Sequence, residues 1–250
     1  MKKRVIRGIL VLGLGVCAFS LQGCELSGSS YSYADDVKVI EVNNTVSEVV
    51  AKVENACVGI YSANSSTGAT GSGVVYKKDG QKYYCITNYH VVEDFSTFRV
   101  YLSDSFSISA KLEATYPGND LACLSFEAAD KYDIGVIDIQ SSEPKITVGE
   151  TVIAIGCPLG LSNFNYVSVG VASSSIFSST VNSKAVDIFY HDAAINSGNS
   201  GGALFNITGT LIGINFRKVV TDNEGYMVEG MGEAIYVGEV VDFLISNSLL

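Results

Sequence analysis

The chain has 250 residues, 47% of them hydrophobic and 17% charged, so it can bury a sizeable core and falls outside the composition of disordered proteins. Its formal net charge is −10, and without residues 1–23, which carry four basic and no acidic residues, it becomes 12 − 26 = −14. So acidic a protein repels phosphate, which makes nucleic acid and anionic lipid poor candidates for a partner.

Residues 1–23 predict an export signal. Four basic residues precede an apolar run over 9–19, which is too short for a comfortable membrane span. The segment ends in Leu21-Gln22-Gly23-Cys24 and resembles the lipobox of bacterial lipoproteins, although Gln22 is not the usual small residue. We expect Cys24 to be lipidated and to become the mature N-terminus. An ordinary secretory signal and an uncleaved anchor are the alternatives.

Residues 24–44 are rich in Ser, Gly, Tyr and Asp without a clear period and are interpreted as a tether.

Two helices are predicted, one directly after the tether and one at the C-terminal end of the sequence. The run from Thr45 to Glu48, TVSE, fits a capping box and predicts a short helix over 46–55. Apolar residues at i, i+3, i+4, i+7 and i+8 predict a C-terminal helix, with Val237, Val240, Val241, Leu244 and Ile245 on one apolar face.

Between these helices, short runs of β-branched and aromatic residues recur, separated by Gly, Ser, Asn and Asp. The runs are CVGIYSA, SGVVYKK, KYYCITN, FRVYLS, ISAKLEATY, LACLSF, TVIAIG, YVSVGVASSSIF, VDIFY and TLIGIN. This spacing is typical of an all-β sandwich or barrel. The absence of strand–helix alternation disfavours a doubly wound sheet. The predicted fold class is therefore all-β.

Four cysteines, Cys57, Cys85, Cys123 and Cys157, each lie inside one of the apolar runs or beside it. None shows the CxxC spacing of a zinc site. We interpret them as buried free thiols that pack as small hydrophobic side chains. Disulfide bonds, which an exported chain permits, are the alternative.

The stretch NSGNSGGALF, residues 196–205, places Ser200 in a Gly-rich turn and makes it a candidate nucleophile. A serine hydroxyl needs a base to remove its proton, and histidine is the usual base near neutral pH. Of the two histidines, His90 follows an apolar strand and is the candidate base, whereas His191 is interpreted as a satisfied or exposed side chain. Asp120 sits at the mouth of an apolar strand, where a carboxylate needs a partner such as a histidine.

The same turn is expected to supply an oxyanion hole from Gly198, Asn199 and Ser200. A positive φ at Gly198 turns successive N–H groups to the same side of the chain, where they can bind a developing negative charge. Gly201 and Gly202 let the backbone pass close behind the serine without a Cβ clash.

The order His90, Asp120, Ser200 is that of the chymotrypsin class, and the G-x-S-x-G elbow of the α/β-hydrolases is absent. Through TNYHVV, NDLACLSF and HDAAINSGNSGGALFN, the chain resembles the trypsin-like serine proteases, specifically the bacterial HtrA/Deg branch. TGSGVVY, GETVIAIGCPLGL, GTLIGIN and GMGEAIYVGEVVDFL extend the resemblance over about residues 45–248. It implies two six-stranded antiparallel β-barrels, with the catalytic triad in the cleft between them.

The resemblance also implies a specificity pocket beside the serine. No Asp stands where a preference for Lys or Arg requires one, so small or medium apolar side chains are expected. Glu233 stands where the family usually has an aromatic residue, and its carboxylate is expected to alter the preference or to face solvent. The predicted pocket residues are Ala194, Ile195, Ile214, Asn215, Phe216 and Glu233.

Two further features depart from the family. Ser197 stands where the family usually has proline, which leaves the oxyanion loop less rigid. The 250 residues contain no PDZ domain, which puts PDZ-triggered activation and cage assembly in question.

The sequence predicts a signal peptide over 1–23, a lipidated tether over 24–44 and a protease domain over 45–250. We expect a serine endopeptidase in the bacterial cell envelope, anchored by lipid and facing outside the cytoplasm. It would cleave unfolded or extended polypeptides and would need no cofactor or metal. A latent protease-fold lipoprotein that binds peptides, and a serine esterase, are the alternatives.

Overall fold

The computed structural model describes residues 42–139, 144–222 and 224–250, with side chains from residue 45 onward. The predicted signal peptide, Cys24 and most of the predicted tether lie outside the described residues. No helix in the described ranges is long and apolar enough to cross a membrane.

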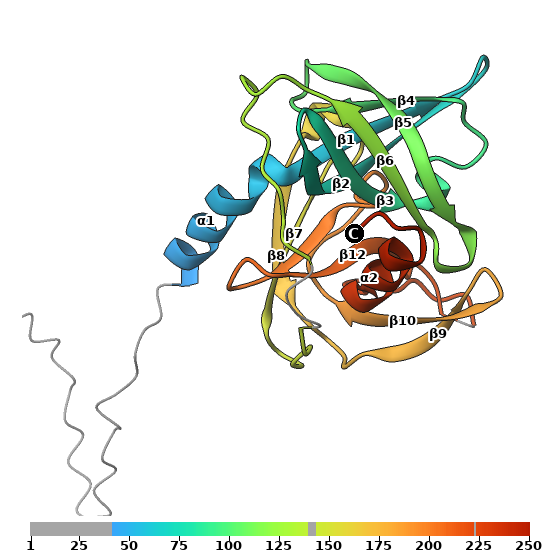
Figure 1. Ribbon diagram of the computed structural model, residues 1–250. Helices are drawn as coiled ribbons and strands as arrows, with labels where there is room; N and C mark the ends of the chain where they lie inside the picture. The colour runs from blue at the N-terminus through green and yellow to red at the C-terminus, as the bar shows by residue number, and fades with distance from the viewer. Residues whose placement is uncertain (1–41, 140–143, 223) are drawn as a thin grey trace, which may run out of the picture. The chain divides into compact units, whose positions relative to one another are not determined.

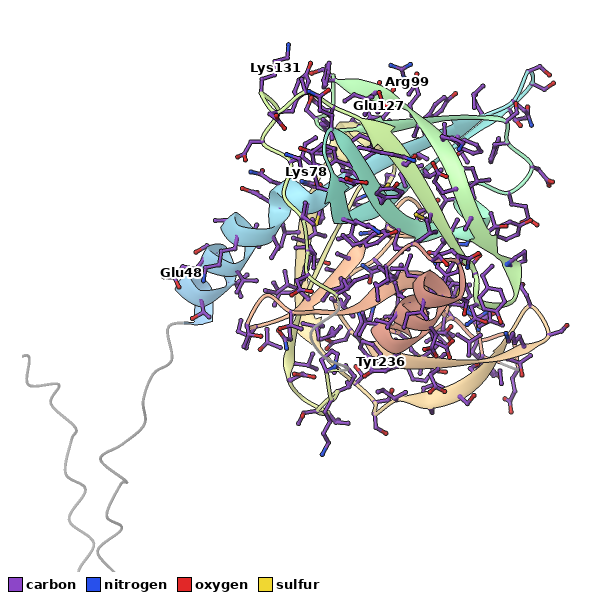
Figure 2. The ribbon with its side chains drawn as sticks, viewed as in Figure 1. Glu48, Lys78, Arg99, Glu127, Lys131 and Tyr236 are labelled. Carbon is purple, nitrogen blue, oxygen red and sulfur yellow. The ribbon has the colours of Figure 1, made fainter. Side chains whose placement is uncertain are left out.

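The first half of the described chain forms a closed antiparallel barrel. Its strand order is β1-β2-β3-β6-β5-β4, and β4 pairs with β1 to complete the closure. Alternate side chains fill the interior, where the Tyr83 and Phe126 rings stack with their centroids 5.5 Å apart. Lys78, Arg99 and Glu127 lie on the outside (Figure 2). The strands are β1 (Cys57–Ala63), β2 (Gly68–Asp79), β3 (Lys82–Asn88), β4 (Thr97–Tyr101), β5 (Ser107–Tyr116) and β6 (Leu121–Glu127).

The second half forms a seven-stranded antiparallel sheet rather than the expected six-stranded barrel, with the order β8-β7-β11-β12-β13-β10-β9. The sheet curls back on itself, because Ala172 bridges His191 and the Val171 N–H donates to the Asp192 carboxylate at 2.6 Å. The all-β class and the two-body arrangement are confirmed. The strands are β7 (Thr151–Gly156), β8 (Tyr166–Val171), β9 (Phe177–Val181), β10 (Lys184–His191), β11 (Ala203–Asn206), β12 (Leu211–Lys218) and β13 (Gly232–Tyr236).

Helix α1 (Val42–Val53) begins three residues before Thr45, so the expected capping box does not start it, and residues 42–44 belong to the helix rather than to the tether. The apolar spacing of the sequence explains the difference, since the period of Val46, Val49, Val50 and Val53 continues back to position 42. Val49 and Val53 are buried. The helix continues directly into a 3₁₀ turn, Glu54–Ala56, that leads to β1.

Helix α2 (Val237–Ser246) confirms the predicted C-terminal helix, with a buried face slightly rotated from the expected one. Val237, Val240 and Leu244 are buried as part of the apolar face, and so is Phe243, whereas Ile245 is 57% exposed. The helix lies over the second sheet (Figure 1), and the Phe243 ring stacks on Tyr116 at the end of β5, with centroids 6.3 Å apart. Apolar packing thus joins α2 to both halves of the fold.

All four cysteines in the described part of the chain are buried and free, as predicted. Burial raises the pKa of each thiol above its ordinary value. They therefore pack as small apolar side chains and add no covalent cross-link to the fold.

Candidate active site

The closed barrel holds His90 and Asp120 in contact. His90 lies in a 3₁₀ turn, Tyr89–Val91, directly after β3, and Asp120 follows a second 3₁₀ turn, Pro117–Asn119, directly before β6. Because β3 and β6 are neighbours with Asn88 opposite Leu121, the two turns meet at one end of the barrel. His90 Nδ1 lies 2.7 Å from Asp120 Oδ2.

Asp120 is fixed by its backbone as well as by its side chain. Its φ is +51°, in the left-handed region that Asp tolerates better than most residues. Its carbonyl accepts from the Tyr89 N–H at 3.0 Å and from Asn88 Nδ2 at 3.0 Å. Its Oδ1 accepts from the His90 N–H at 2.9 Å. The carboxylate is 2% exposed, so it holds the His90 ring from inside the protein.

This pairing assigns the two ring nitrogens of His90 different roles. An ionised carboxylate only accepts hydrogen bonds, so Nδ1 carries the proton that faces Asp120. In the neutral ring, Nε2 then keeps its lone pair and can accept a proton. The His90 side chain is 43% exposed, so this lone pair can be reached from solvent or by a substrate.

Ser200 comes from the second sheet, in the turn between β10 and β11. Ser200 and His90 line the same cavity of about 370 Å³. The Ser200 hydroxyl donates to the Phe216 carbonyl at 3.3 Å, and within the described residues it makes no hydrogen bond to His90. Hydrogen bonds of this kind are often long or absent without substrate and tighten in the complex. The structure therefore brings the three residues together but leaves the serine turned toward β12.

Three backbone N–H groups of the Gly-rich turn have no acceptor in the described chain, those of Ser197, Gly198 and Ser200, and the last two belong to the predicted oxyanion set. Gly198 has a φ of +100°, and a Cβ there would lie 2.3 Å from the Cys157 carbonyl oxygen, so only glycine fits. The Asn199 N–H, also expected to face an oxyanion, instead donates to the Asn196 carbonyl at 3.0 Å. The available donors are therefore the first and third residues of the predicted set.

The cavity is lined by three of the six predicted pocket residues, Ile195, Asn215 and Phe216. A β-bulge explains how Phe216 reaches it, because Asn215 pairs with Ala234 and Arg217 with Glu233, which leaves Phe216 as the extra residue. The bulge also presents the carbonyl that holds the Ser200 hydroxyl. The lining residues that the sequence prediction missed are Asn196, Ser197, Arg217 and Lys218.

The other three predicted pocket residues lie elsewhere. Ile214 is fully buried in the core of the second sheet, and Ala194 is exposed in a neighbouring depression. Glu233 neither lines the cavity nor faces solvent, because its side chain is 4% exposed and accepts from Arg217 Nε at 2.5 Å. Cross-strand pairing explains why Glu233 is not in the cavity. Arg217, which follows Phe216 on β12, is paired with Glu233 on β13, so the carboxylate contacts the guanidinium instead.

His191 is neither satisfied nor exposed. It is fully buried at the end of β10, and neither ring nitrogen makes a hydrogen bond of normal geometry to the described residues, although the Asn215 side chain and the Ala193 backbone lie close enough to interact with the ring. Burial lowers its pKa to about 4, and the Asp192 carboxylate, the Asn215 side chain and the Ala193 backbone oppose this shift only in part. The ring is therefore neutral near pH 7, and it does not line the cavity that holds Ser200.

Comparisons with known proteins agree with this geometry. The family model described as "Trypsin-like peptidase domain" matches residues 71–214. The serine protease Do-like HtrA of Lactococcus lactis subsp. cremoris is 31% identical over 96% of this chain and 66% of its own length. That of Bacillus subtilis is 37% identical over 78% of this chain and 43% of its own length.

Solved structures give the same answer. The crystal structure of the serine endoprotease from Yersinia pestis has a TM-score of 0.63 at 27% identity, over 80% of this chain and 65% of that one. The chain thus spans less than two thirds of the length of these relatives. With the barrel, the curled sheet and the meeting of His90, Asp120 and Ser200, these matches show that the chain belongs to the trypsin-like peptidase family, in its HtrA/Deg branch.

Proposed function

We propose that this protein is a serine endopeptidase that cleaves polypeptides through an acyl-enzyme on Ser200. The observation that carries the proposal is the buried Asp120 carboxylate, 2.7 Å from His90 Nδ1, beside a cavity that also contains the serine. Membership of a peptidase family supports it. The Asp120 side chain is only 2% exposed, so its carboxylate needs hydrogen-bond partners inside the protein, and the His90 N–H and ring supply them.

In the proposed reaction, Ser200 turns from the Phe216 carbonyl toward His90 when a peptide enters the cavity. Its Oγ attacks the scissile carbonyl carbon while His90 Nε2 takes the hydroxyl proton. Asp120 keeps Nδ1 protonated and stabilises the imidazolium that forms. His90 then gives the proton to the leaving amine, which breaks the C–N bond. Water attacks the acyl-enzyme by the same route and releases the second product.

The Gly198 and Ser200 N–H groups are the proposed oxyanion donors. Both lack an acceptor in the described chain, so they are free to bind the negative oxygen of the tetrahedral intermediate. One such donor is worth about 10² to 10³ in kcat in comparable sites. Neither donor requires a cofactor or a metal ion.

Labelling with a fluorophosphonate tests the proposal, because this probe reacts only with an activated serine. The chain from residue 42 is treated with a rhodamine fluorophosphonate, and Ser200→Ala and His90→Ala are compared with Ser105→Ala, an exposed serine in the turn between β4 and β5. We expect label on the wild type and Ser105→Ala and none on the other two. Circular dichroism checks that all four proteins are folded. Absence of label from a folded wild type contradicts the proposal.

One observation favours a second candidate, a latent protease-fold protein that binds peptides. The Ser200 hydroxyl is engaged by the Phe216 carbonyl rather than by His90. In that case the folded wild type stays unlabelled, yet a peptide retained in the cavity protects the Phe216 region from hydrogen exchange. The two candidates therefore give opposite labelling results.

We further propose that the protein acts in the cell envelope on unfolded or extended polypeptides, tethered through a lipid on Cys24. The basic and apolar segments before Cys24 support export. Growth of a bacterial host that expresses the full chain with an alkyne fatty acid tests the tether. We expect the protein to carry the alkyne and Cys24→Ser to lack it. A wild type without alkyne contradicts lipidation at this residue.

A further inference from the structure

Ser72 is a buried serine of β2 that lies against the Gly-rich turn of the other body. Its residue surface is 1% exposed, and it belongs to the closed barrel, whereas Ser200 belongs to the second sheet. The contact is a close one, because a Cβ on Gly201 would lie 2.3 Å from the Ser72 carbonyl oxygen. A Cβ on Gly71 would in turn lie 3.2 Å from the Ser200 carbonyl oxygen. The strand and the turn are thus in backbone contact.

Every polar group of Ser72 is used. Its hydroxyl donates to the Gly198 carbonyl at 2.7 Å and accepts from the Cys157 N–H at 2.8 Å. Its N–H donates to the Ser200 carbonyl at 2.9 Å, and its own carbonyl accepts from Thr87 Oγ1 at 2.8 Å. All are within the normal range of strong hydrogen bonds and lie away from water, which makes them costly to lose.

Ser72 therefore binds the carbonyl groups of Gly198 and Ser200, the two residues whose N–H groups are the proposed oxyanion donors. Because a peptide unit is planar, a hydrogen bond that restrains its carbonyl oxygen also limits how far the whole unit can rotate. The two fixed peptide planes flank the one that carries the Ser200 N–H. Position 197 is serine rather than proline, so the backbone of the turn is less restricted by its own sequence. The hydrogen bonds from Ser72 therefore matter more for its conformation.

We propose that Ser72 is a positioning residue for the oxyanion hole, and that its hydroxyl holds the turn in the conformation that leaves the Gly198 and Ser200 N–H groups free for the substrate oxygen. It touches neither substrate nor the reacting atoms. The inference rests on the proposed peptidase function, since an oxyanion hole has a use only in acyl transfer or a similar reaction. It predicts that a barrel residue outside the cavity lining controls the rate of the chemical step.

The kinetics of the fluorophosphonate reaction test this inference, because the phosphonyl oxygen of the probe occupies the oxyanion hole as the serine is modified. The rate constant at saturation, kinact, and the half-saturating concentration, KI, are measured for wild type, Ser72→Ala and Ser62→Ala. Ser62 is the matched control: it is a buried serine of β1 in the same barrel, and its hydroxyl has no hydrogen-bond partner among the described residues.

We expect Ser72→Ala to lower kinact by about 10² to 10³, the loss seen when one oxyanion donor is removed, while Ser62→Ala stays near wild type. KI should change by less than about threefold, because the cavity lining is untouched. The pH midpoint of kinact should not move, because the contact between His90 and Asp120 is intact.

Other outcomes overturn the inference in distinguishable ways. A kinact of Ser72→Ala within about threefold of Ser62→Ala removes the positioning role and leaves the peptidase intact. A loss that also shifts KI and the pH midpoint means general damage to the fold, and the positioning role is then wrong. If Ser72→Ala does not fold, Ser72→Cys is measured, and wild-type kinact from this weaker donor contradicts the inference. An unlabelled wild type defeats the proposed function itself.

Discussion

Arg217 on β12 donates through Nε to Glu233 on β13 at 2.5 Å, and the two residues are directly paired in the antiparallel ladder. The pair is asymmetric in burial, since the Arg217 side chain is 49% exposed and that of Glu233 is 4% exposed. The Arg217 guanidinium also lies over the Phe216 ring, 4.8 Å from its centroid. Replacing Arg217 and replacing Glu233 should therefore lower the stability by different amounts.

We expect Arg217→Met to lower the free energy of unfolding more than Glu233→Gln does. Removal of the arginine leaves a buried carboxylate unpaired, which costs about 3 kcal/mol in comparable sites. Removal of the carboxylate leaves a cation that water can solvate, which costs about 1 kcal/mol or less. Urea unfolding of both variants measures the difference. Equal losses would show that Glu233 finds another partner.

Two cations, Arg217 and Lys218, line the cavity, whereas their acidic partners Glu233 and Glu229 do not. A peptide with Lys at the residue that provides the scissile carbonyl should therefore be cleaved at least about fivefold more slowly than the same peptide with Val at that position, because like charges repel. The Arg217→Met variant should narrow this ratio, and Lys131→Met, an exposed lysine elsewhere, should not. Fluorogenic peptides differing at this one position provide the measurement. Preferred cleavage of the Lys peptide contradicts the assignment of the cavity.

Asp120→Asn should reduce kcat by about 10⁴ and leave the fold intact. The amide removes the charge that keeps the proton on His90 Nδ1, so the ring adopts the wrong tautomer for a base. It keeps one oxygen that can accept from the His90 N–H. Hydrolysis of fluorescein-labelled casein gives the rate, and Asp104→Asn, an exposed acid, is the control. A loss below about tenfold would remove Asp120 from the proposed mechanism.

Stability should fall as the pH falls from about 6.5 to about 4, in part because of His191. Burial lowers the pKa of this residue in the folded chain to about 4 from an ordinary value of 6.5. The unfolded chain therefore takes up the proton first, and protonation favours unfolding through that window. A shift of this size corresponds to about 3 kcal/mol.

Comparison of wild type with His191→Leu isolates this contribution, since carboxylates elsewhere titrate equally in both proteins. The ring nitrogens make no hydrogen bond of normal geometry to the described residues, so the apolar replacement removes only the weaker interactions with Asn215 and Ala193. We expect the urea midpoint of the variant to change less between pH 7 and pH 4 than that of the wild type. Parallel curves would show that His191 is not protonated on unfolding in this range.

Strand periodicity and motif order were enough to predict the fold class, because β-branched runs broken by turn residues leave few other arrangements. The boundaries of β1, β3 and β7 match the predicted runs. The run YVSVGVASSSIF covers β8 and the first residue of β9, with an irregular segment between the two strands. The end of β8 is marked by the bridge between Ala172 and His191. This contact joins residues distant in the sequence, so the run itself does not show it.

The cavity was harder to predict than the residues proposed for catalysis. A bulge moves Phe216 out of the alternation, so the residues after it change faces, and no sequence signal within β12 announces this shift. Arg217 and Lys218 could have been suspected, because they directly follow the strand assigned to the pocket. Ser72 could not, since its role depends on contact between segments 126 residues apart.

The four buried thiols can be used to measure local unfolding of the protein. A protonated, buried thiol does not react with an alkylating reagent, so modification of any of them measures how often the structure around it exposes itself. Cys85 lies inside the closed barrel, and Cys157 is joined through its N–H to Ser72. In variants that keep one thiol each, the alkylation rate of Cys85 would report local opening of the barrel, and that of Cys157 would report opening near the oxyanion turn.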